Sequence, residues 1–270
     1  MTTTTKAVIL ARGLGTRMRK ADDSASLDAS QSAAADTGVK GMIPVGRPFM
    51  DYLISALADA GFTDVCIVVG PEHDEVRRYY EHDAVLSRIS VGFVVQERPL
   101  GTADAVLAAE AFPAGDSFVV QNSDNYYPVP ALAELGRRRG PALVAFERQA
   151  LVRLGNIPHE RLERFGALDI GGDGFLRRVV GNPGVAEDGE AAVYASLNCW
   201  LFTPEIFRAC REVQQSARGE FELPQAVQLG IDKLGMRFEA VMMAAGVLDM
   251  SSRGDIASVT ERLRATEVKL

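Results

Sequence analysis

The stretch ILARGLGTRMRK, residues 9–20, begins inside an apolar run and ends in a cluster of basic side chains. Gly13 and Gly15 allow backbone N–H groups to approach a ligand closely, and Arg17 adds positive charge beside them. This arrangement, at the start of a helix, is typical of a phosphate-binding turn. Two glycines alone would equally describe a surface turn, so the choice depends on what the rest of the chain brings beside them.

Outward from this stretch, strands and helices alternate through the first half of the chain. Near-continuous Val/Ile strands separated by helices indicate a parallel sheet covered on both faces, and hence an α/β, Rossmann-like fold. We expect strands at 7–11, 64–69, 91–95, 117–121 and 142–147, and helices at 48–61, 72–81, 102–112 and 130–139. Thr102 is expected to be the N-cap of the third of these helices.

The pattern changes after about residue 150. A hairpin is expected around the Gly-Gly-Asp-Gly turn of residues 164–180, and one strand over 193–202 should lead into a helix capped by Thr203. A helix at 223–235, a strand at 238–247 and a closing helix at 255–266 follow. We therefore expect one domain, 1–270, with a parallel half (1–150) and an α+β half (151–270) added onto one edge of its sheet.

Residues 21–38 are rich in Ala, Ser and Asp and carry almost nothing to bury. They predict a mobile loop or a loosely held helix. Their position between two basic clusters suits a lid, and a tolerated insertion explains them equally well.

Composition limits the classes of partner. The net charge of −7 argues against nucleic acid as a partner, because binding its backbone needs a basic surface. No window of about eighteen apolar residues is present, so we expect no membrane span, and with no secretory signal we expect a cytoplasmic protein. Cys66, Cys199 and Cys210 are widely spaced in apolar contexts and are expected to be buried free thiols.

Three polar loops follow different strands of the expected parallel sheet. They are RGLGTRMRK after the first strand, QERPLGTADAV after the third and QNSDNYYP after the fourth. Because ligands bind beyond the carboxyl ends of such strands, we expect these loops to converge on one site. Asp124 follows a buried strand there and could hold Mg²⁺ together with phosphate oxygens. Asp249, taken alone, is as well explained as a turn or helix-capping residue.

Two common phosphate-binding motifs do not fit. A dinucleotide fingerprint needs a third glycine where Met18 stands, and the ATPase phosphate loop needs Gly-Lys-Ser/Thr, which is absent.

Taken together, the segments resemble the sugar-phosphate nucleotidylyltransferases. LARGLGTRM followed by KGMIPVGRPFMDYLISAL resembles the family's opening and its later lysine, and QERPLGTADAV is similar to its loop for base and ribose. NSDNYYP resembles the metal-aspartate segment, and RFGALDI, ASLNCWLF and LDMSSRGDI follow in family order. The matches cover roughly residues 6 to 260.

The resemblance implies a transfer of a nucleoside monophosphate from a triphosphate to a sugar 1-phosphate, with release of pyrophosphate. It implies catalytic roles for Arg17, Lys40 and Asp124, and Mg²⁺ held by Asp124 and Asp249. It places the nucleotide beside Ala11, Gly13, Gly15, Thr16, Gln96, Pro99, Gly101 and Thr102, and the sugar beside Gly166, Ser196 and Glu220. Gln96 would pair with a uracil or thymine edge, which favours a pyrimidine triphosphate. A homo-oligomer is left open.

The chain departs from the family pattern at several positions. Arg12 stands where a small residue is usual, Ser123 replaces the glycine before the metal aspartate, and Gly181 and Asn182 stand in place of Glu-Lys. Asn198 replaces a glycine, and Ser251 and Ser252 replace Gly-Thr. Most of these changes fall on the sugar side, so three alternatives stay open: a sugar acceptor, a non-sugar phosphate acceptor, and a catalytically silent relative that only binds nucleotide.

Overall fold

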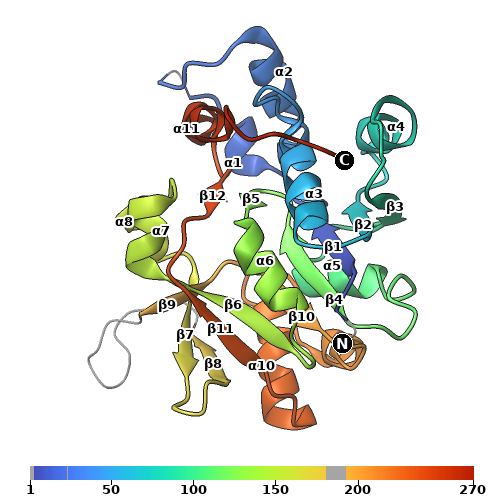
Figure 1. Cartoon of the computed structure of the whole chain (residues 1–270), viewed down its shortest axis with the longest axis vertical. Helices are drawn as coiled ribbons and strands as arrows, with labels where there is room; N and C mark the ends of the chain where they lie inside the picture. Colours follow the sequence, from blue (N-terminus) through green and yellow to red (C-terminus); the bar gives the residue numbers. More distant parts are fainter. Residues whose placement is uncertain (1–2, 23, 181–192) are drawn as a thin grey trace.

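The computed structural model describes residues 3–22, 24–180 and 193–270, and its centre is a mixed β-sheet with helices packed around it (Figure 1). The first half of the chain supplies β1 (Lys6–Leu10), β2 (Asp64–Val69), β3 (Ser90–Val95), β4 (Phe118–Asn122) and β6 (Ala142–Glu147). The second half supplies β7 (Gly166–Ile170), β8 (Leu176–Val180), β9 (Tyr194–Ser196), β10 (Trp200–Phe202) and β11 (Glu239–Met243). Two short strands, β5 (Asn125–Tyr126) and β12 (Leu248–Asp249), pair with each other apart from this sheet.

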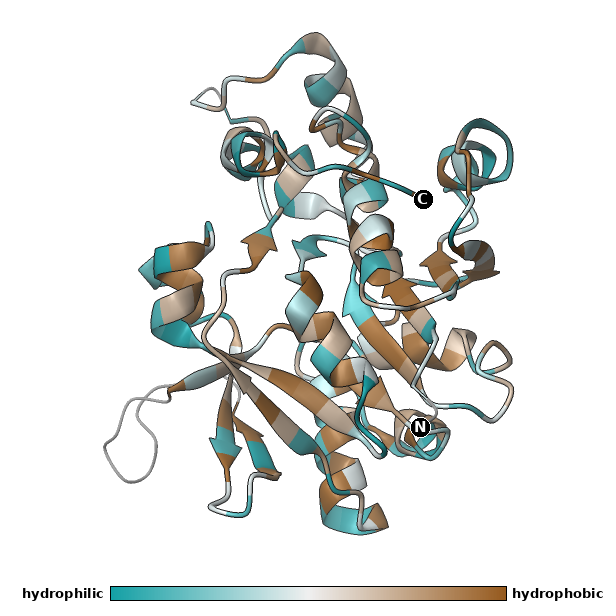
Figure 2. Cartoon of the chain, in the orientation of Figure 1, coloured by the Kyte–Doolittle hydropathy of each residue, from teal (hydrophilic) through white to brown (hydrophobic). Residues whose placement is uncertain are grey.

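The parallel part of the sheet has the order β3-β2-β1-β4. Alternate side chains of β1 enter different cores: Ala7 and Ile9 join one apolar cluster, whereas Val8 and Leu10 join another on the opposite face. Figure 2 shows these strands, together with β6 and β11, as largely hydrophobic. Burial on both faces explains why β1 and β2 beyond their first residue, and the first residues of β4, are continuously apolar, and the predicted parallel sheet is confirmed.

The strand order corrects two expectations about the second half. The segment expected as one strand over 193–202 forms β9 and β10, separated at Asn198, whose φ is +61°. Strand β10 lies between β4 and β6 and is antiparallel to both. The second half is therefore not simply added onto one edge, because it supplies a strand that separates β4 from β6.

The helices lie on both faces of the sheet and at its ends. They are α1 (Thr16–Arg19), α2 (Ala29–Thr37), η1 (Lys40–Met42), α3 (Phe49–Asp59), α4 (Asp74–Arg78), η2 (Tyr79–Asp83), α5 (Thr102–Ala108), α6 (Val129–Gly136), α7 (Arg148–Leu154), α8 (His159–Leu162), α9 (Ile206–Glu212), α10 (Leu223–Leu234) and α11 (Arg253–Leu263). None of the helices in the described part of the chain has both the length and the apolar character that a membrane span requires.

A third apolar cluster joins the start and the end of the chain. Met18 of α1, Phe49 of α3, Met250 after β12 and Ile256 of α11 are buried together in it. Figure 1 accordingly shows α11 beside α1, although the two helices are more than 200 residues apart. This packing holds the glycine-rich turn close to the short strand that contains Asp249.

The segment 21–38 forms a helix over part of its length. The Asp28 side chain accepts a hydrogen bond from the Gln31 backbone, the Gln31 side chain accepts one from the Asp28 backbone, and Gly38 ends α2 with a φ of +76°. Arg253 of α11 forms an ion pair with Asp36 of this helix. The helix alternative is therefore correct for residues 29–37, and α2 is attached to the third cluster.

Candidate active site

Lys40 and Asp124 form the centre of the candidate site. Lys40 is the first residue of η1, and Asp124 lies in the turn between β4 and β5. The Lys40 Nζ donates to Asp124 Oδ2 at 2.7 Å, and the two side chains are 14% and 23% exposed. Asp124, from one of the predicted loops, is thus in direct contact with Lys40, the lysine that the family resemblance indicated, while their catalytic roles remain predictions.

Asp249 is held next to this pair by the pairing of β12 with β5. Asp249 is opposite Asn125 in the register, and the Met250 N–H donates to the Asp124 carbonyl at 2.8 Å. The Asn125 amide donates to Asp249 Oδ1 at 3.0 Å. Burial raises the pKa of Asp249 above its usual value, and the negative charge of Asp124 raises it further. The two acids predicted to hold a metal therefore lie close enough to interact.

Arg161 is a partner of Asp249 that the sequence did not reveal. Its guanidinium donates to Asp249 Oδ2 at 2.7 Å and to Asp255 Oδ1 at 2.8 Å, so it joins α8 to β12 and to the start of α11. Asn156, in the connection between α7 and α8, exchanges two hydrogen bonds with the Asp249 backbone. Asp255 also accepts from Ser252 at the N-terminus of α11. The Asp249 carboxylate is therefore fixed from two directions.

The donor chemistry of these acids fits a hard divalent cation. Asp124 and Asp249 offer carboxylate oxygens, which are the ligands that Mg²⁺ prefers, and Mg²⁺ commonly takes only one or two of them together with phosphates and waters. Among the described residues, no group of three His, Cys, Asp or Glu side chains could hold a metal ion by itself. A cation at this position would therefore take its remaining oxygens from waters or from a bound substrate.

The glycine-rich turn packs directly against the segment that leads to Lys40. Gly15 has a φ of +61°, and a Cβ at this position would overlap the carbonyl oxygen of Gly38. The Arg19 guanidinium donates two hydrogen bonds to the Thr37 carbonyl, at 3.0 and 2.7 Å. Glycine is thus required at position 15 for close contact between two protein segments, and the turn and Lys40 are positioned together.

The remaining residues of this turn are less constrained. Gly13 has open space around it, whereas Ala11 is buried and its N–H donates to the Val68 carbonyl at 2.9 Å. Thr16 and Arg17 are exposed in α1. Within the described part of the chain, Arg17 makes no side-chain hydrogen bond or ion pair, so it is not brought into contact with Lys40 or Asp124.

The predicted base-binding loop is held by its own hydrogen bonds. Gln96 is buried, and its Nε2 donates to the Gly101 carbonyl at 3.1 Å and to Asp104 Oδ2 at 2.6 Å. Gly101 has a φ of +114°, and a Cβ there would meet the backbone of Phe221. Gln96 and Gly101 are thus brought together, but the amide donor expected to read a base is engaged with this loop.

Two helix caps differ from the prediction. The N-cap of α5 is Gly101, and the Thr102 hydroxyl instead accepts a hydrogen bond from the Leu223 N–H at 2.8 Å, at the start of α10. The N-cap of α9 is Glu205 rather than Thr203. The prediction of Thr102 as N-cap is wrong because its hydroxyl accepts a hydrogen bond from a residue 121 positions further along the chain. The local sequence does not show this contact.

Arg12 connects the ends of three strands. Its Nε donates to the Gln96 carbonyl at 3.2 Å, its Nη1 lies 2.6 Å from Glu72 Oε1, and the side chain packs against Gly70. This departure from the family pattern thus has a structural role, because a buried guanidinium fixes the loops beyond β1, β2 and β3.

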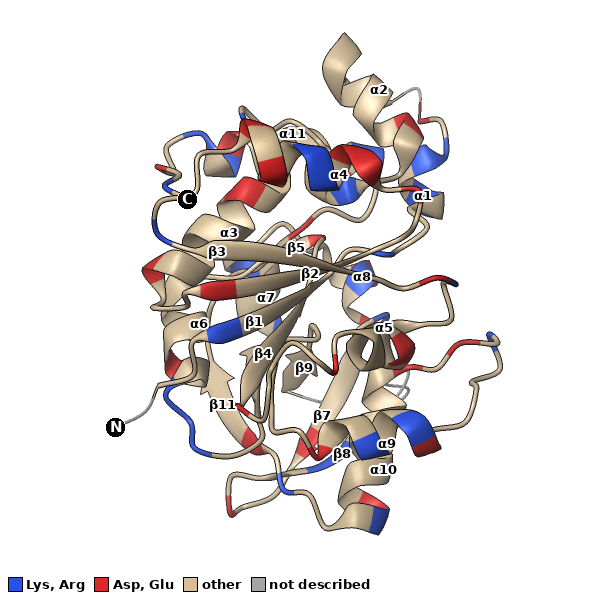
Figure 3. Cartoon of the chain, turned by 90° about the vertical axis from the view of Figure 1, so that its right-hand side faces the viewer, with Lys and Arg blue, Asp and Glu red and all other residues tan. Residues whose placement is uncertain are grey.

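On the sugar side, two of the three predicted residues come together. Gly166 of β7 and Ser196 of β9 are register partners, and Ser196 is 7% exposed. Glu220, the third residue predicted to face the sugar, is exposed in a loop, and so is Pro99 of the predicted nucleotide-binding residues. Gly181 and Asn182 lie outside the described residues. Figure 3 shows that the charged residues of the chain are mainly in its helices and loops rather than in the central sheet.

Comparison with known proteins identifies the family. The model of the nucleotidyl transferase family matches residues 34–251. The chain belongs to this family. The chain is 30% identical over 259 residues to a glucose-1-phosphate thymidylyltransferase of Streptomyces antibioticus, covering 94% of this chain and 65% of the relative. It is 24% identical to the UTP–glucose-1-phosphate uridylyltransferase AglF of Haloferax volcanii, covering 96% of each chain. Three of the curated relatives are longer, and the chain spans 56–65% of their lengths.

Solved structures of this fold confirm the α/β architecture. A UTP-bound UGPase from Acinetobacter baumannii superposes with a TM-score of 0.75 at 18% identity, covering 98% of this chain and 95% of that one. A UDP-glucose pyrophosphorylase complexed with UDP-glucose gives a TM-score of 0.74 at 16% identity, covering 98% of this chain and 100% of that one. The family resemblance drawn from the sequence motifs is confirmed by the family model and the curated relatives, and the solved structures confirm the fold.

Proposed function

We propose that the protein transfers a nucleoside monophosphate from a nucleoside triphosphate to a sugar 1-phosphate, releasing pyrophosphate and forming a nucleotide-activated sugar. The contact of Lys40 with Asp124, beside Asp249, carries this proposal. It puts a cation that can neutralise phosphate next to acids that can hold a metal. Family membership and relatives named as thymidylyl- and uridylyltransferases support the reaction class.

The chemistry needs positioning and charge neutralisation more than a protein nucleophile. A phosphate oxygen of the acceptor attacks the α-phosphorus in line, and the bond from the α-phosphorus to the β-phosphate oxygen breaks. Lys40 neutralises the α-phosphate or the incoming phosphate, and Arg17, exposed and unpaired in the described part of the chain, binds the β- and γ-phosphates. The N–H groups near Gly13 and Gly15 approach the phosphates. Mg²⁺ held by Asp124 and Asp249 supplies further stabilisation of the developing charge.

We further propose a pyrimidine triphosphate and a hexose 1-phosphate as substrates. The relatives described above, which are thymidylyl- and uridylyltransferases, support the pyrimidine. Gln96 would have to exchange its hydrogen bonds to Gly101 and Asp104 for a bond to the base. Gly166 and Ser196, paired on adjacent strands, would face the sugar. Glu220 would supply a further hydroxyl partner from its exposed loop.

The test is pyrophosphate release, measured with Mg²⁺ across a panel of nucleoside triphosphates and sugar 1-phosphates. Asp124→Asn should abolish turnover while the protein stays folded, because the amide removes the negative charge that faces Lys40 and the metal. Asp83→Asn is the matched control, since Asp83 is exposed and makes no ion pair within the described residues. Absence of turnover with every pair of substrates, in a folded protein, would overturn the enzymatic proposal.

A silent, nucleotide-binding relative is the second candidate. It is favoured by the two protein cations, Lys40 and Arg161, that already neutralise both acids. Calorimetry separates the two candidates: tight binding of triphosphate without turnover supports the silent relative, and turnover excludes it. A third outcome, turnover only with a non-sugar phosphate such as phosphocholine, would replace the acceptor and keep the chemistry.

A further inference from the structure

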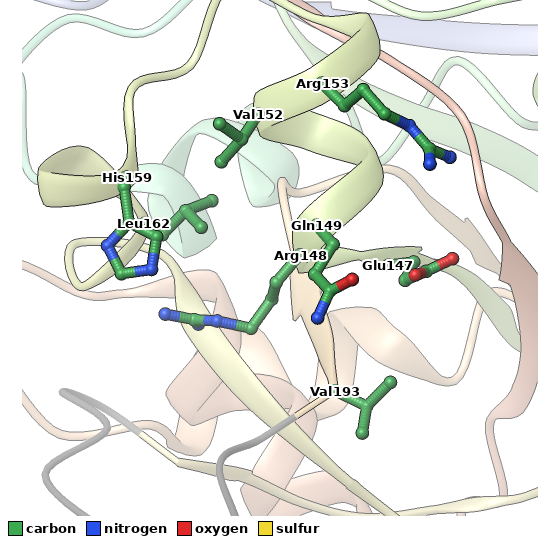
Figure 4. Close-up of a pocket in the computed structure, with 8 residues that line it drawn as sticks. All are labelled: Glu147, Arg148, Gln149, Val152, Arg153, His159, Leu162 and Val193. Carbon is green, nitrogen blue, oxygen red and sulfur yellow. The ribbon is translucent and has the colours of Figure 1, made fainter.

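A cavity of about 420 Å³ lies beside the carboxyl end of β6, between α7, α8 and Val193 (Figure 4). This volume is within the usual range of small-molecule sites. Val152, Leu162 and Val193 give it apolar walls, and Arg148 and His159 give it polar groups. None of the residues assigned above to nucleotide, sugar or metal lines this cavity.

Arg148 has a buried nitrogen without a partner in this cavity. The backbone of Arg148 is fixed, because its N–H donates to the Val193 carbonyl at 2.9 Å. Its Nη1 is buried and has no hydrogen-bond partner. Figure 4 shows the guanidinium extended toward His159, whereas Glu147 and Arg153 lie on the other side of the α7 terminus in that view.

An unpaired, buried guanidinium nitrogen is costly and needs a physical explanation. Burial lowers the pKa of Arg148, and the negative charge of Glu163 opposes this lowering without a hydrogen bond to the group. A ligand oxygen that accepts from Nη1 would compensate the desolvation. Arginine is suited to carboxylate and phosphate groups because its planar donors match their geometry.

We propose that this cavity binds a small organic anion. Its carboxylate or phosphate group pairs with Arg148 beside His159, and its carbon body lies against Val152, Leu162 and Val193. The exposed fractions of Val152 and Val193, 38% and 58%, leave apolar surface for such a body to cover. The site is separate from the triphosphate site and does not depend on the proposed reaction.

The cavity lies against α8, the helix that also binds Asp249 of the candidate active site. His159 and Leu162 of α8 line the cavity, while Arg161 of the same helix binds Asp249. Asn156, between α7 and α8, holds the Asp249 backbone. A ligand in the cavity would therefore contact α8, whose Arg161 holds one of the predicted metal ligands, and α7, which precedes Asn156.

The test is titration calorimetry of the full chain with phenyl phosphate, which combines an anionic group with an apolar body. Inorganic phosphate and phenol are the separate halves of this probe. We expect binding of phenyl phosphate to exceed that of either half, and Arg148→Met to weaken it about tenfold or more, as for the loss of a charged hydrogen bond.

Two control variants and one variant of the cavity wall make the result specific. Arg164→Met removes the same charge from an exposed position in the same segment and should leave binding unchanged. Lys40→Met should also leave it unchanged, because the probe would not lie in the triphosphate site. Val193→Trp should weaken binding by filling the cavity without altering Arg148. The proposal is overturned if the protein shows no binding at millimolar probe, if Arg148→Met binds as tightly as the unaltered chain, or if Lys40→Met removes the binding.

Discussion

Arg161→Met would remove the cation between two buried acids. The Asp249 and Asp255 side chains are 3% and 8% exposed, and each lies within 2.8 Å of the guanidinium. Methionine keeps an unbranched apolar stem of similar reach but carries no charge or donor. Breaking a buried ion pair in this way generally costs about 3–5 kcal/mol, because a charge is left uncompensated.

The remaining hydrogen bonds favour the lower end of this range. Asp255 keeps donors from Ser251 and Ser252, and Asp249 keeps the Asn125 amide. Arg161 itself is 16% exposed, so water compensates part of the loss. We therefore expect a decrease of about 3 kcal/mol in the free energy of unfolding, which corresponds to a fall of roughly 6–12 °C in Tm for a domain of this size.

The assay is urea unfolding followed by circular dichroism at several pH values. Burial and Asp124 raise the pKa of Asp249 in the folded protein, and loss of Arg161 should raise it further, because the guanidinium opposes that shift. An acid with a raised pKa in the folded state destabilises it above that pKa and ceases to do so as the pH falls through it. The difference between variant and unaltered protein should therefore be largest at neutral pH and decrease toward acidic pH.

Arg164→Met is again the control, since it changes the same charge at an exposed position. The reasoning is refuted if Arg161→Met unfolds at the same urea concentration as Arg164→Met at neutral pH. It is also refuted if the destabilisation grows as the pH is lowered, because protonation of Asp249 should relieve it.

Gly15→Ala should destabilise the protein and weaken triphosphate binding, because φ is positive there and a Cβ would overlap Gly38, whereas Gly13→Ala, with open space around it, should unfold normally. Equal unfolding midpoints for the two variants in a urea titration would contradict this. The three cysteine thiols should not react with a disulfide reagent at pH 8 until the protein unfolds, since all three are buried and burial raises the pKa of Cys66 to about 12. A thiol that reacts at once in the native protein, followed by absorbance, would contradict the buried environment.

The parallel strands could be predicted because their burial is visible in the sequence. Val8 and Ile9 pack on opposite faces of the sheet, so a central strand such as β1 has to be apolar on both faces. The order of the strands was not predictable in the same way. The run from Tyr194 to Phe202 contains Asn198, which interrupts it with a positive φ, but nothing in the run indicates that its second part enters between β4 and β6.

One acid of the candidate site was accessible to sequence reasoning for a similar reason. Asp124 comes shortly after the apolar residues of a buried strand, which is a recognisable position for a carboxylate at a strand end. Asp249 taken alone is equally well explained as a turn residue, and its predicted role came from the family resemblance. Arg161 and Asn156 belong to no such pattern, because they lie in and beside the short helix α8 and bind residues about 90 positions further along the chain. Only the packing of α8 against β12 shows that they act on the same carboxylate.

The contribution of the second half explains why the site spans the whole sequence. Strand β10 is hydrogen-bonded to both β4 and β6. These two strands of the central sheet come from the first half of the chain and are joined through a strand that comes later. Strand β12 pairs with β5 and thereby brings Asp249 to Asp124. Lys40 reaches the same turn from η1, which follows the helix attached to α11 through Arg253 and Asp36. The two carboxylates and the lysine are therefore held together by contacts of both the sheet and the closing helix, so changes in α11 should affect the chemistry attributed to Lys40, Asp124 and Asp249.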